Sequence, residues 1–237
     1  MGRGGSSYFA GKSIVGNARK SRAQSEVSRS ESEVASSRAA SEMYGRMKDL
    51  EPGITSNMKQ IEQLTGGKLV GLNFRLKDLD SLTRKIKKDV AESNGKLTPE
   101  EAAANIADGV RFTLQFNDED YTAGVQRSLD TLKSQGYEIL AVKNFWQKGD
   151  PYQGINVKLR RDGVLTELQF HTPESHHTKE TRLHDDYKIY RDKTLHSEAD
   201  RKAAYERMVA AADRYIPDPK DLAKLLTIGT MAYQTFG

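Results

Sequence analysis

The chain has 237 residues, enough for one substantial hydrophobic core or for one domain with an extension. Its formal charge of +4, with 30% charged residues, is too mild for a dedicated DNA-binding protein but is compatible with phosphate ligands. The absence of cysteine excludes a disulfide framework, a thiolate metal site and a cysteine nucleophile, and no apolar stretch is long enough to predict a membrane span.

Residues 1–51 are rich in Ser, Arg, Ala, Gly and Glu and cannot bury a core. This composition predicts an arm that is disordered or that becomes helical only against a partner. Pro52-Gly53 then punctuates the chain, and apolar residues at helical spacing predict a short helix that ends at Gly66-Gly67. We therefore divide the chain into an arm, 1–51, and one domain, 52–237.

A second helix is predicted from Asn73 to about Glu92, because leucines and isoleucine recur along one of its faces. Lys77, Ser81 and Lys85 are spaced four residues apart and would stack on another side of this helix. Such a run is ordinarily a solvated face. The scarcity of acidic partners within it, and a serine between two lysines, instead favour a site for phosphate oxygens.

The middle of the chain predicts helices and strands in alternation. Thr98-Pro99 with two glutamates begins a short helix, a strand follows within 106–116, and a helix covers 121–134. Strands are predicted at 137–145 and around 155–159, and Arg161-Asp162-Gly163 forms a hairpin into the next strand. Helices at 174–191, 197–214 and 220–233 would pack on the sheet as a cap. This order predicts an α/β (α+β) fold with a mixed β-sheet flanked by helices.

The strand after the hairpin carries polar groups on one face. At period two, Val164, Thr166, Leu168 and Phe170 share a face that packs, and the opposite face carries Leu165, Glu167, Gln169 and His171. A carboxylate, an amide and an imidazole side by side indicate the wall of a site. The alternative, an edge strand with an ordinary polar face, stays open for this stretch alone.

Five marks in a fixed order resemble the synthetase domain of the RelA/SpoT family, the pyrophosphokinases that make ppGpp-type alarmones. The resemblance covers about 54–191. The marks are the Lys77, Ser81 and Lys85 spacing; Asp108-Gly109-Val110-Arg111; Tyr152-Gln153-Gly154-Ile155-Asn156; Glu167-Leu168-Gln169-Phe170-His171-Thr172; and Lys179-Glu180 with His184 and Tyr187. By analogy the sheet would be related to that of the polymerase-β nucleotidyltransferases.

The resemblance implies a reaction and a role for each matching residue. Asp108 and Glu167 would be the paired catalytic carboxylates that hold Mg²⁺, and Glu167 would also take the proton from the attacking 3′-hydroxyl. The triphosphate of the donor ATP would be bound by Arg75, Lys77, Ser81, Lys85 and Arg111. Tyr152 would stack on the base of the acceptor nucleotide, and the other acceptor residues would be Asn156, Gln169, His171 and Lys143.

Departures from the housekeeping synthetases affect the acceptor side. Those proteins usually carry Ser and His where this chain has Gly154 and Asn156, and Ile-Arg where it has Phe170-His171. The variant pattern is more similar to the ATP nucleotide 3′-pyrophosphokinases and the toxic small alarmone synthetases. These imply an adenine or guanine acceptor, or the 3′ end of tRNA.

The same branch implies a setting for the protein. We expect a toxin or secreted effector that acts in the cytoplasm and is exported, if at all, by a route that needs no signal peptide, because the first residues lack an apolar signal core. An immunity or antitoxin protein that binds the arm or the site is an expected partner, and a membrane is not.

Two hypotheses from other classes compete with this interpretation. The chain could be a non-catalytic nucleotide- or RNA-binding protein on the same fold, although two retained carboxylates argue against it. A zinc site would need His171, His176, His177 and His184, but adjacent His176 and His177 point apart on a helix. Capping or substrate contact suits the histidines better.

Overall fold

The computed structural model describes residues 10–147 and 149–229, and side chains from residue 30 onward. The chain forms two compact units. The first comprises Met1–Gly45 and Asp78–Asn105, and the second comprises Arg46–Lys77 and Ile106–Gly237. Helix α1 (Ala10–Thr65) passes from the first unit into the second.

Helix α1 continues where the sequence predicts a break. Pro52 lies inside it and Gly53 follows without interruption, so the predicted punctuation at these two residues is wrong. Proline removes one backbone hydrogen bond, but the buried side chains of Met47 and Met58 anchor the helix on either side. The predicted arm is therefore helical from residue 10 to residue 51, while residues 1–9 lie outside the described part. Its need for a partner stays a prediction.

The first unit contains α2 (Leu79–Glu92) and α3 (Pro99–Ala104) beside the earlier part of α1. Its buried residues include Leu82 and Ile86, which have no exposed surface. The predicted start of α3 is confirmed, because Thr98 and Glu101 form a reciprocal capping box with proline at the first turn.

The second unit is built on a mixed five-stranded sheet, which confirms the predicted fold class. The strands are β1 (Lys68–Val70), β2 (Arg111–Gln115), β3 (Glu138–Asn144), β4 (Ile155–Arg161) and β5 (Val164–His171), in the order β1-β2-β5-β4-β3. Strands β2 and β5 are parallel, and the other neighbours are antiparallel. The predicted hairpin is also confirmed, with Asp162 and Gly163 at φ of 52° and 76°.

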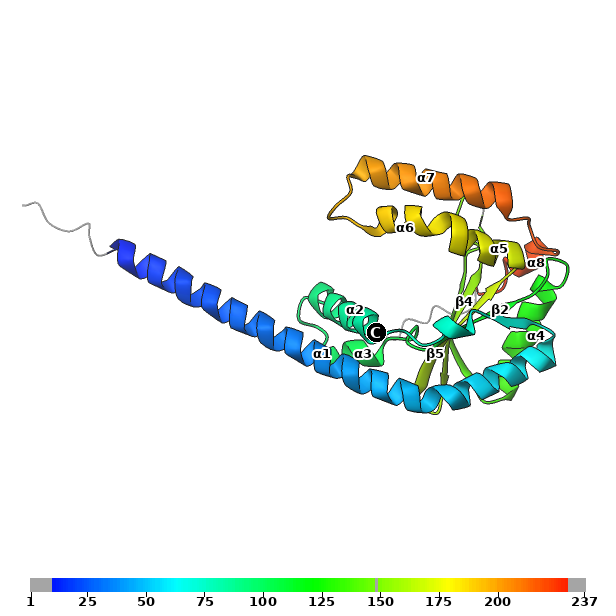
Figure 1. Cartoon of the computed structure of the whole chain (residues 1–237), viewed down its shortest axis with the longest axis horizontal. Coiled ribbons are helices and arrows are strands. Elements are labelled where there is room, and N and C mark those ends of the chain that lie inside the picture. Colours follow the sequence, from blue (N-terminus) through cyan, green and yellow to red (C-terminus); the bar gives the residue numbers. More distant parts are fainter. Residues whose placement is uncertain (1–9, 148, 230–237) are drawn as a thin grey trace, which may run out of the picture. The chain divides into compact units, whose positions relative to one another are not determined.

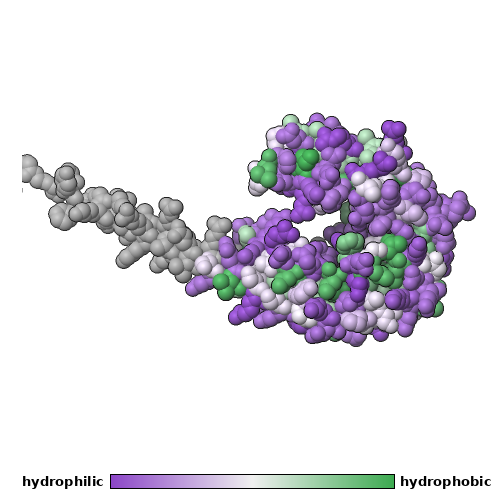
Figure 2. All heavy atoms as spheres, viewed as in Figure 1, coloured by the Kyte–Doolittle hydropathy of each residue, from purple (hydrophilic) through white to green (hydrophobic). Residues whose placement is uncertain are grey.

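One face of the sheet forms the hydrophobic core under α4 (Tyr121–Ser134). Its buried residues are Phe112, Leu114, Ile155, Val157, Leu159, Leu168 and Phe170. The Tyr121 hydroxyl donates to the Phe170 carbonyl at 2.9 Å, and Arg127 donates to the Thr65 carbonyl at 2.9 Å, so α4 joins β5 to the end of α1 (Figure 1). Figure 2 shows mainly hydrophilic residues on the visible surface, with hydrophobic ones in separate groups.

The segment after β5 contains several helices. They are α5 (Pro173–Thr178), a π-helical turn η2 (Lys179–Leu183), α6 (His184–Arg191), α7 (Glu198–Tyr215) and α8 (Leu222–Leu225). The predicted helical stretch over 174–191 is therefore confirmed, with a π turn inside it. Helix α5 contacts β5, and α6 and α7 lie side by side, with α7 against α5 and η2 (Figure 1).

Two further observations concern the helices. The helix predicted over 220–233 is only the short α8, and residues 230–233 lie outside the described part. Among the described helices, none has the length and apolar character needed to cross a bilayer.

Candidate active site

Parallel pairing of β2 with β5 sets the position of the two candidate carboxylates. Arg111 lies opposite Glu167 in register, and the Glu167 amide donates to the Val110 carbonyl at 3.1 Å. Asp108 lies in the turn two residues before Val110. Two acids distant in sequence are therefore carried by neighbouring segments of one sheet, which no local sequence pattern specifies.

Lys77 is paired with Asp108, from Nζ to Oδ2 at 2.7 Å, and both side chains are about three-quarters buried. Lys77 lies in an extended segment, because its amide donates to Gly109 at 2.9 Å and the Arg111 amide donates to Arg75 at 2.8 Å. Pairing with the start of β2 thus holds this segment out of a helix. This pairing places the Lys77 side chain beside the Asp108 carboxylate.

The predicted ladder of Lys77, Ser81 and Lys85 on one helix is wrong. Helix α2 begins only at Leu79, because the Asp78 carboxylate caps it by accepting from the Ser81 amide at 2.7 Å. Ser81 and Lys85 belong to the first unit, whereas Lys77 belongs to the second. Lys85 also has an acidic neighbour after all, Asp89, at 3.3 Å. The donor role of Ser81 and Lys85 stays a prediction.

Arg75, another predicted donor-binding residue, is tied to helix α1. Its guanidinium pairs with the nearly buried carboxylate of Glu51, where Nη2 donates to Oε2 at 3.3 Å. Nη1 of the same guanidinium donates to the Leu72 carbonyl at 2.5 Å. The hydrogen bond from Arg75 lowers the pKa of Glu51, more than burial raises it. Arg75 therefore stabilises the fold beside the site in addition to any role toward a ligand.

The second carboxylate belongs to a chain of alternating polar groups. The Gln169 amide nitrogen donates to Glu167 Oε1 at 2.6 Å, and Lys179 Nζ donates to Gln169 Oε1 at 3.1 Å. Lys179 also pairs with Glu180 at 3.0 Å. Burial would raise the pKa of Glu180, but the charge and hydrogen bond of Lys179 lower it. The π turn thus places a cation one amide away from Glu167.

A second polar cluster surrounds Tyr152. Its hydroxyl donates to Asn156 Oδ1 at 2.6 Å and lies 3.0 Å from His171 Nε2. His171 Nδ1 lies 2.9 Å from the Ser175 hydroxyl. Burial and the nearby Glu167 carboxylate raise the pKa of Tyr152 well above 10, so its hydroxyl stays protonated at neutral pH. Of the predicted acceptor residues, Tyr152 therefore contacts both Asn156 and His171.

Helix α5 fixes the end of this cluster. Thr172 and Ser175 form a reciprocal capping box, with hydrogen bonds of 3.1 and 3.0 Å, and Pro173 occupies the first turn. This cap was not predicted, although Thr-Pro-Glu-Ser carries its signature. Ser175 and Lys179 are therefore candidate site residues that the sequence analysis did not assign, because their partners lie on β5.

Basic residues of β3 and β4 line the same face of the sheet. Lys143 lies opposite Asn156, and Lys158 lies opposite Glu167. Burial lowers the pKa of Lys158, and the positive charges of Lys143 and Arg160 lower it further. The predicted acceptor residue Lys143 is exposed and stands in this basic group. The polar face therefore combines carboxylates with cations from several strands.

The two carboxylates suit a hard cation only in part. Among the described residues, no group of three or more His, Cys, Asp or Glu is arranged to hold a metal ion. Mg²⁺ is usually bound by one or two carboxylates together with substrate phosphates, so Asp108 and Glu167 fit it only when a nucleotide supplies further oxygens. Lys77 and Gln169, which now contact the carboxylate oxygens of Asp108 and Glu167, would have to release those oxygens to the metal.

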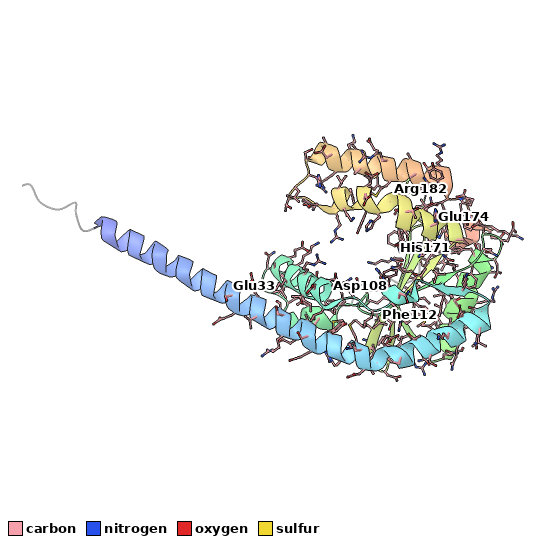
Figure 3. All side chains as sticks on the ribbon, in the orientation of Figure 1. Glu33, Asp108, Phe112, His171, Glu174 and Arg182 are labelled. Atoms are coloured by element: carbon pink, nitrogen blue, oxygen red, sulfur yellow. The ribbon has the colours of Figure 1, made fainter. Side chains whose placement is uncertain are left out.

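The two faces of the sheet carry different side chains. Phe112 of β2 faces the apolar core, whereas His171 of β5 is buried on the polar face with the clusters described above (Figure 3). A small cavity beside α5 is lined by residues that include Glu174, Arg182 and Tyr215, where the guanidinium lies 3.8 Å above the tyrosine ring. These residues are separate from the carboxylates.

No protein-family model matches this chain, and no curated protein matches it. Solved structures do resemble it. The small alarmone synthetase 1 of Bacillus subtilis aligns with a TM-score of 0.48 and 14% identity over 73% of this chain and 88% of its own. The same synthetase bound to its product pppGpp gives 0.47 and 12%, over 71% and 88%.

A GTP pyrophosphokinase family protein from Streptococcus pneumoniae gives a TM-score of 0.45 and 15% identity, over 73% of this chain and 85% of its own.

Proposed function

We propose that the chain is a Mg²⁺-dependent enzyme that transfers pyrophosphate from ATP to the 3′-hydroxyl of a nucleotide. The observation that carries this proposal is the polar face of the sheet, where Glu167 is linked through Gln169 to Lys179 and Asp108 is paired with Lys77. A transfer of this kind needs positioned acids for a hydroxyl and a metal, and cations for phosphate charge.

In the proposed reaction the acceptor 3′-oxygen attacks the β-phosphorus of ATP. A new oxygen–phosphorus bond forms, the bond between the α,β-bridging oxygen and the β-phosphorus breaks, and AMP leaves. Glu167 takes the proton from the attacking hydroxyl, and Gln169 holds the carboxylate in place during the step. Lys77, Arg111 and Lys179 offset the negative charge that builds on the phosphate oxygens.

Mg²⁺ bound by Asp108 and Glu167 would neutralise phosphate charge and align the leaving and attacking oxygens. The Asp108 carboxylate is paired with the Lys77 ammonium in this structure. When a metal ion takes the place of that ammonium beside Asp108, Lys77 can bind a phosphate oxygen instead. A lysine has the flexible stem that such an exchange of partners requires.

The acceptor would lie against Tyr152, with Asn156, Gln169 and Lys143 around it. An aromatic plane binds any base by stacking, worth about 1–3 kcal/mol, and discriminates little between bases. We propose an adenine or guanine nucleotide as acceptor, with the tRNA 3′ end as the alternative. We also propose that the protein is a toxin, because uncontrolled transfer would consume the ATP of a cell, and that an antitoxin protein restrains it.

The proposal is tested by incubating the purified protein with β-labelled ATP, Mg²⁺ and a mixture of AMP, GDP, GTP and tRNA. We expect labelled pyrophosphate on one acceptor, identified by mass spectrometry. Asp108→Asn should remove the product. If nucleotides bind but no label is transferred, the chain is a binding protein and the proposed reaction is wrong.

A further inference from the structure

His171 lies on the strand face that carries the candidate site, yet it has no exposed surface. Its imidazole is enclosed by the Tyr152 ring, which meets it edge-on with centroids 5.2 Å apart, and by His176 at 5.7 Å. A side chain with no accessible atom cannot touch an acceptor directly. Any influence of His171 on a ligand must pass through a neighbour.

The charge state of His171 excludes a role as a cation. Burial disfavours the imidazolium, and the positive charge of Lys179 and the neighbouring His176 disfavour it further, so the pKa of His171 lies well below 6.5. The side chains that face the imidazole are Tyr152, Ser175, His176 and Lys179, and none of them is an acid; a hydrogen bond with the Gln153 backbone raises the pKa, but by less than burial and these charges lower it. At neutral pH His171 is uncharged.

The hydrogen bonds select one neutral tautomer. The Tyr152 hydroxyl has a single proton, which it donates to Asn156 Oδ1 at 2.6 Å. Its oxygen therefore accepts from His171 Nε2–H at 3.0 Å. Nδ1 is then left as an acceptor for the Ser175 hydroxyl at 2.9 Å, which is nearer to that hydroxyl than its other acceptor, the Thr172 carbonyl, at 3.3 Å. The imidazole thus links the start of α5 to the Tyr152 ring.

Gly154 makes room for this ring. A Cβ at Gly154 would lie 2.7 Å from His171 Cε1, closer than real contacts of such atoms, and 3.1 Å from both His171 Nδ1 and the Phe170 carbonyl oxygen, which is tight. The backbone of Gly154 does not have positive φ, so its conformation alone does not demand glycine. The glycine and the histidine, both departures from the housekeeping pattern, are therefore sterically coupled.

We propose that His171 is a positioning residue that fixes the hydroxyl, and hence the ring plane, of Tyr152, and that Gly154 is glycine because it admits this imidazole. Phe145 holds the ring from another side, edge-on at 5.2 Å. What this arrangement means for binding of the acceptor nucleotide rests on the proposed function. Because the hydroxyl is engaged within the protein, Tyr152 offers a base only its ring face, so the stacking position accepts adenine and guanine alike.

The first test uses the full chain without nucleotide. Nitrogen NMR of the imidazoles should show His171 neutral, with its proton on Nε2, from pH 8 down to pH 5.5. Titration of His171 near pH 6.5, or a proton on Nδ1, would overturn the proposed arrangement.

The second test is a double-mutant cycle of Gly154→Ala and His171→Ala, followed by urea unfolding. Gly154→Ala should raise the unfolding constant at least about tenfold in the natural background, and less than about threefold when the imidazole is absent. Gly53→Ala is the matched control, because nothing lies within 4 Å of a Cβ at Gly53. Its effect should be the same in both backgrounds. An equal effect of Gly154→Ala in both would contradict the coupling.

The third test measures the Kd of AMP, GDP and ATP by titration calorimetry in Tyr152→Phe, His171→Ala and the double variant. Each single change should weaken AMP and GDP about tenfold and leave ATP unchanged, and the double should be no worse than either. His171→Gln, whose amide can donate to the hydroxyl, should restore binding.

The outcomes of the third test separate the two proposals. Additive losses, or equal losses for ATP, would show that His171 only supports the fold, and the positioning role would be wrong. If neither AMP nor GDP binds the unaltered protein, the proposed function and the acceptor role of Tyr152 fail together. The tautomer and the Gly154 coupling are then still decided by the first two tests.

Discussion

The two faces of β5 are both largely buried, but different interactions stabilise the side chains on each face. On one face Leu168 and Phe170 have no exposed surface and lie in an apolar core under α4. On the other, Gln169 and His171 are as well buried, yet each is satisfied by hydrogen bonds to Lys179, Tyr152 and neighbours. Apolar packing is non-directional and stabilises the fold, whereas hydrogen bonds are directional and hold specific atoms in position.

This contrast predicts that adjacent residues of β5 fail in different ways when changed. Site-face substitutions should reduce transfer and leave the fold in place, and core-face substitutions should do the reverse. The measurements below test that separation.

The largest effect is expected for Glu167→Gln on the site face. Loss of the base and of a metal-binding oxygen should lower turnover by roughly 10³-fold or more, while the melting temperature changes little. Glu138→Gln is a suitable control. Glu138 lies on the edge strand β3, and its exposed carboxylate pairs with Arg160 of β4. Retained turnover in Glu167→Gln would remove Glu167 from the mechanism.

The neighbouring core residue should behave oppositely. Leu168→Ala leaves a cavity in a fully buried position and should lower the free energy of unfolding by about 3 kcal/mol, measured by urea denaturation. Turnover per folded molecule should be unchanged. Leu165→Ala, at a half-buried position, should cost much less. A loss of turnover without a loss of stability in Leu168→Ala would show that the two faces are not independent.

A smaller effect is expected from Lys179→Met, which removes the cation at the end of the Glu167–Gln169 chain. We expect turnover to fall roughly tenfold, because a cation near the phosphates is lost. The pKa of Glu180 should rise, since Lys179 now lowers it, and NMR titration measures that shift. Lys188→Met, an exposed lysine beside Asp185, is the control and should change neither quantity. An unchanged pKa of Glu180 would contradict the pairing.

The smallest effect is a pH dependence that comes from the polar face. The pKa values of His171 and His176 lie below 6.5 in the folded state, first because of burial and then because of Lys179. Below about pH 6.5 the unfolded chain therefore binds more protons than the folded one. Stability should fall with falling pH, by up to about 1.4 kcal/mol per pH unit for each histidine.

Urea unfolding at pH 7.5 and pH 5.5 measures this loss. His171→Gln should reduce the difference between the two conditions, and His184→Gln, at an exposed position, should keep it. An identical pH dependence in His171→Gln and the unaltered protein would mean that His171 is not held neutral by burial.

Local chemistry explains what could be predicted of the fold. The capping box at Thr98, the hairpin at Asp162-Gly163 and the face pattern of β5 depend on neighbours within a few residues, and all three are present. Two local predictions that depended on distant parts of the chain were wrong. The continuation of α1 through Pro52 and the late start of α2 depend on buried contacts and on pairing with the start of β2.

For the site, the sequence by itself determined the residue types: two carboxylates, a tyrosine, and lysines and arginines in a recognisable order. Only the tertiary structure decided that Lys77 pairs with Asp108, that a π turn carries Lys179 to Gln169, and that Gly154 admits His171. The physical reason is that hydrogen-bond partners and steric gaps are set by strands distant in sequence. Spacing along one strand specifies which face a side chain takes, but not what meets it there.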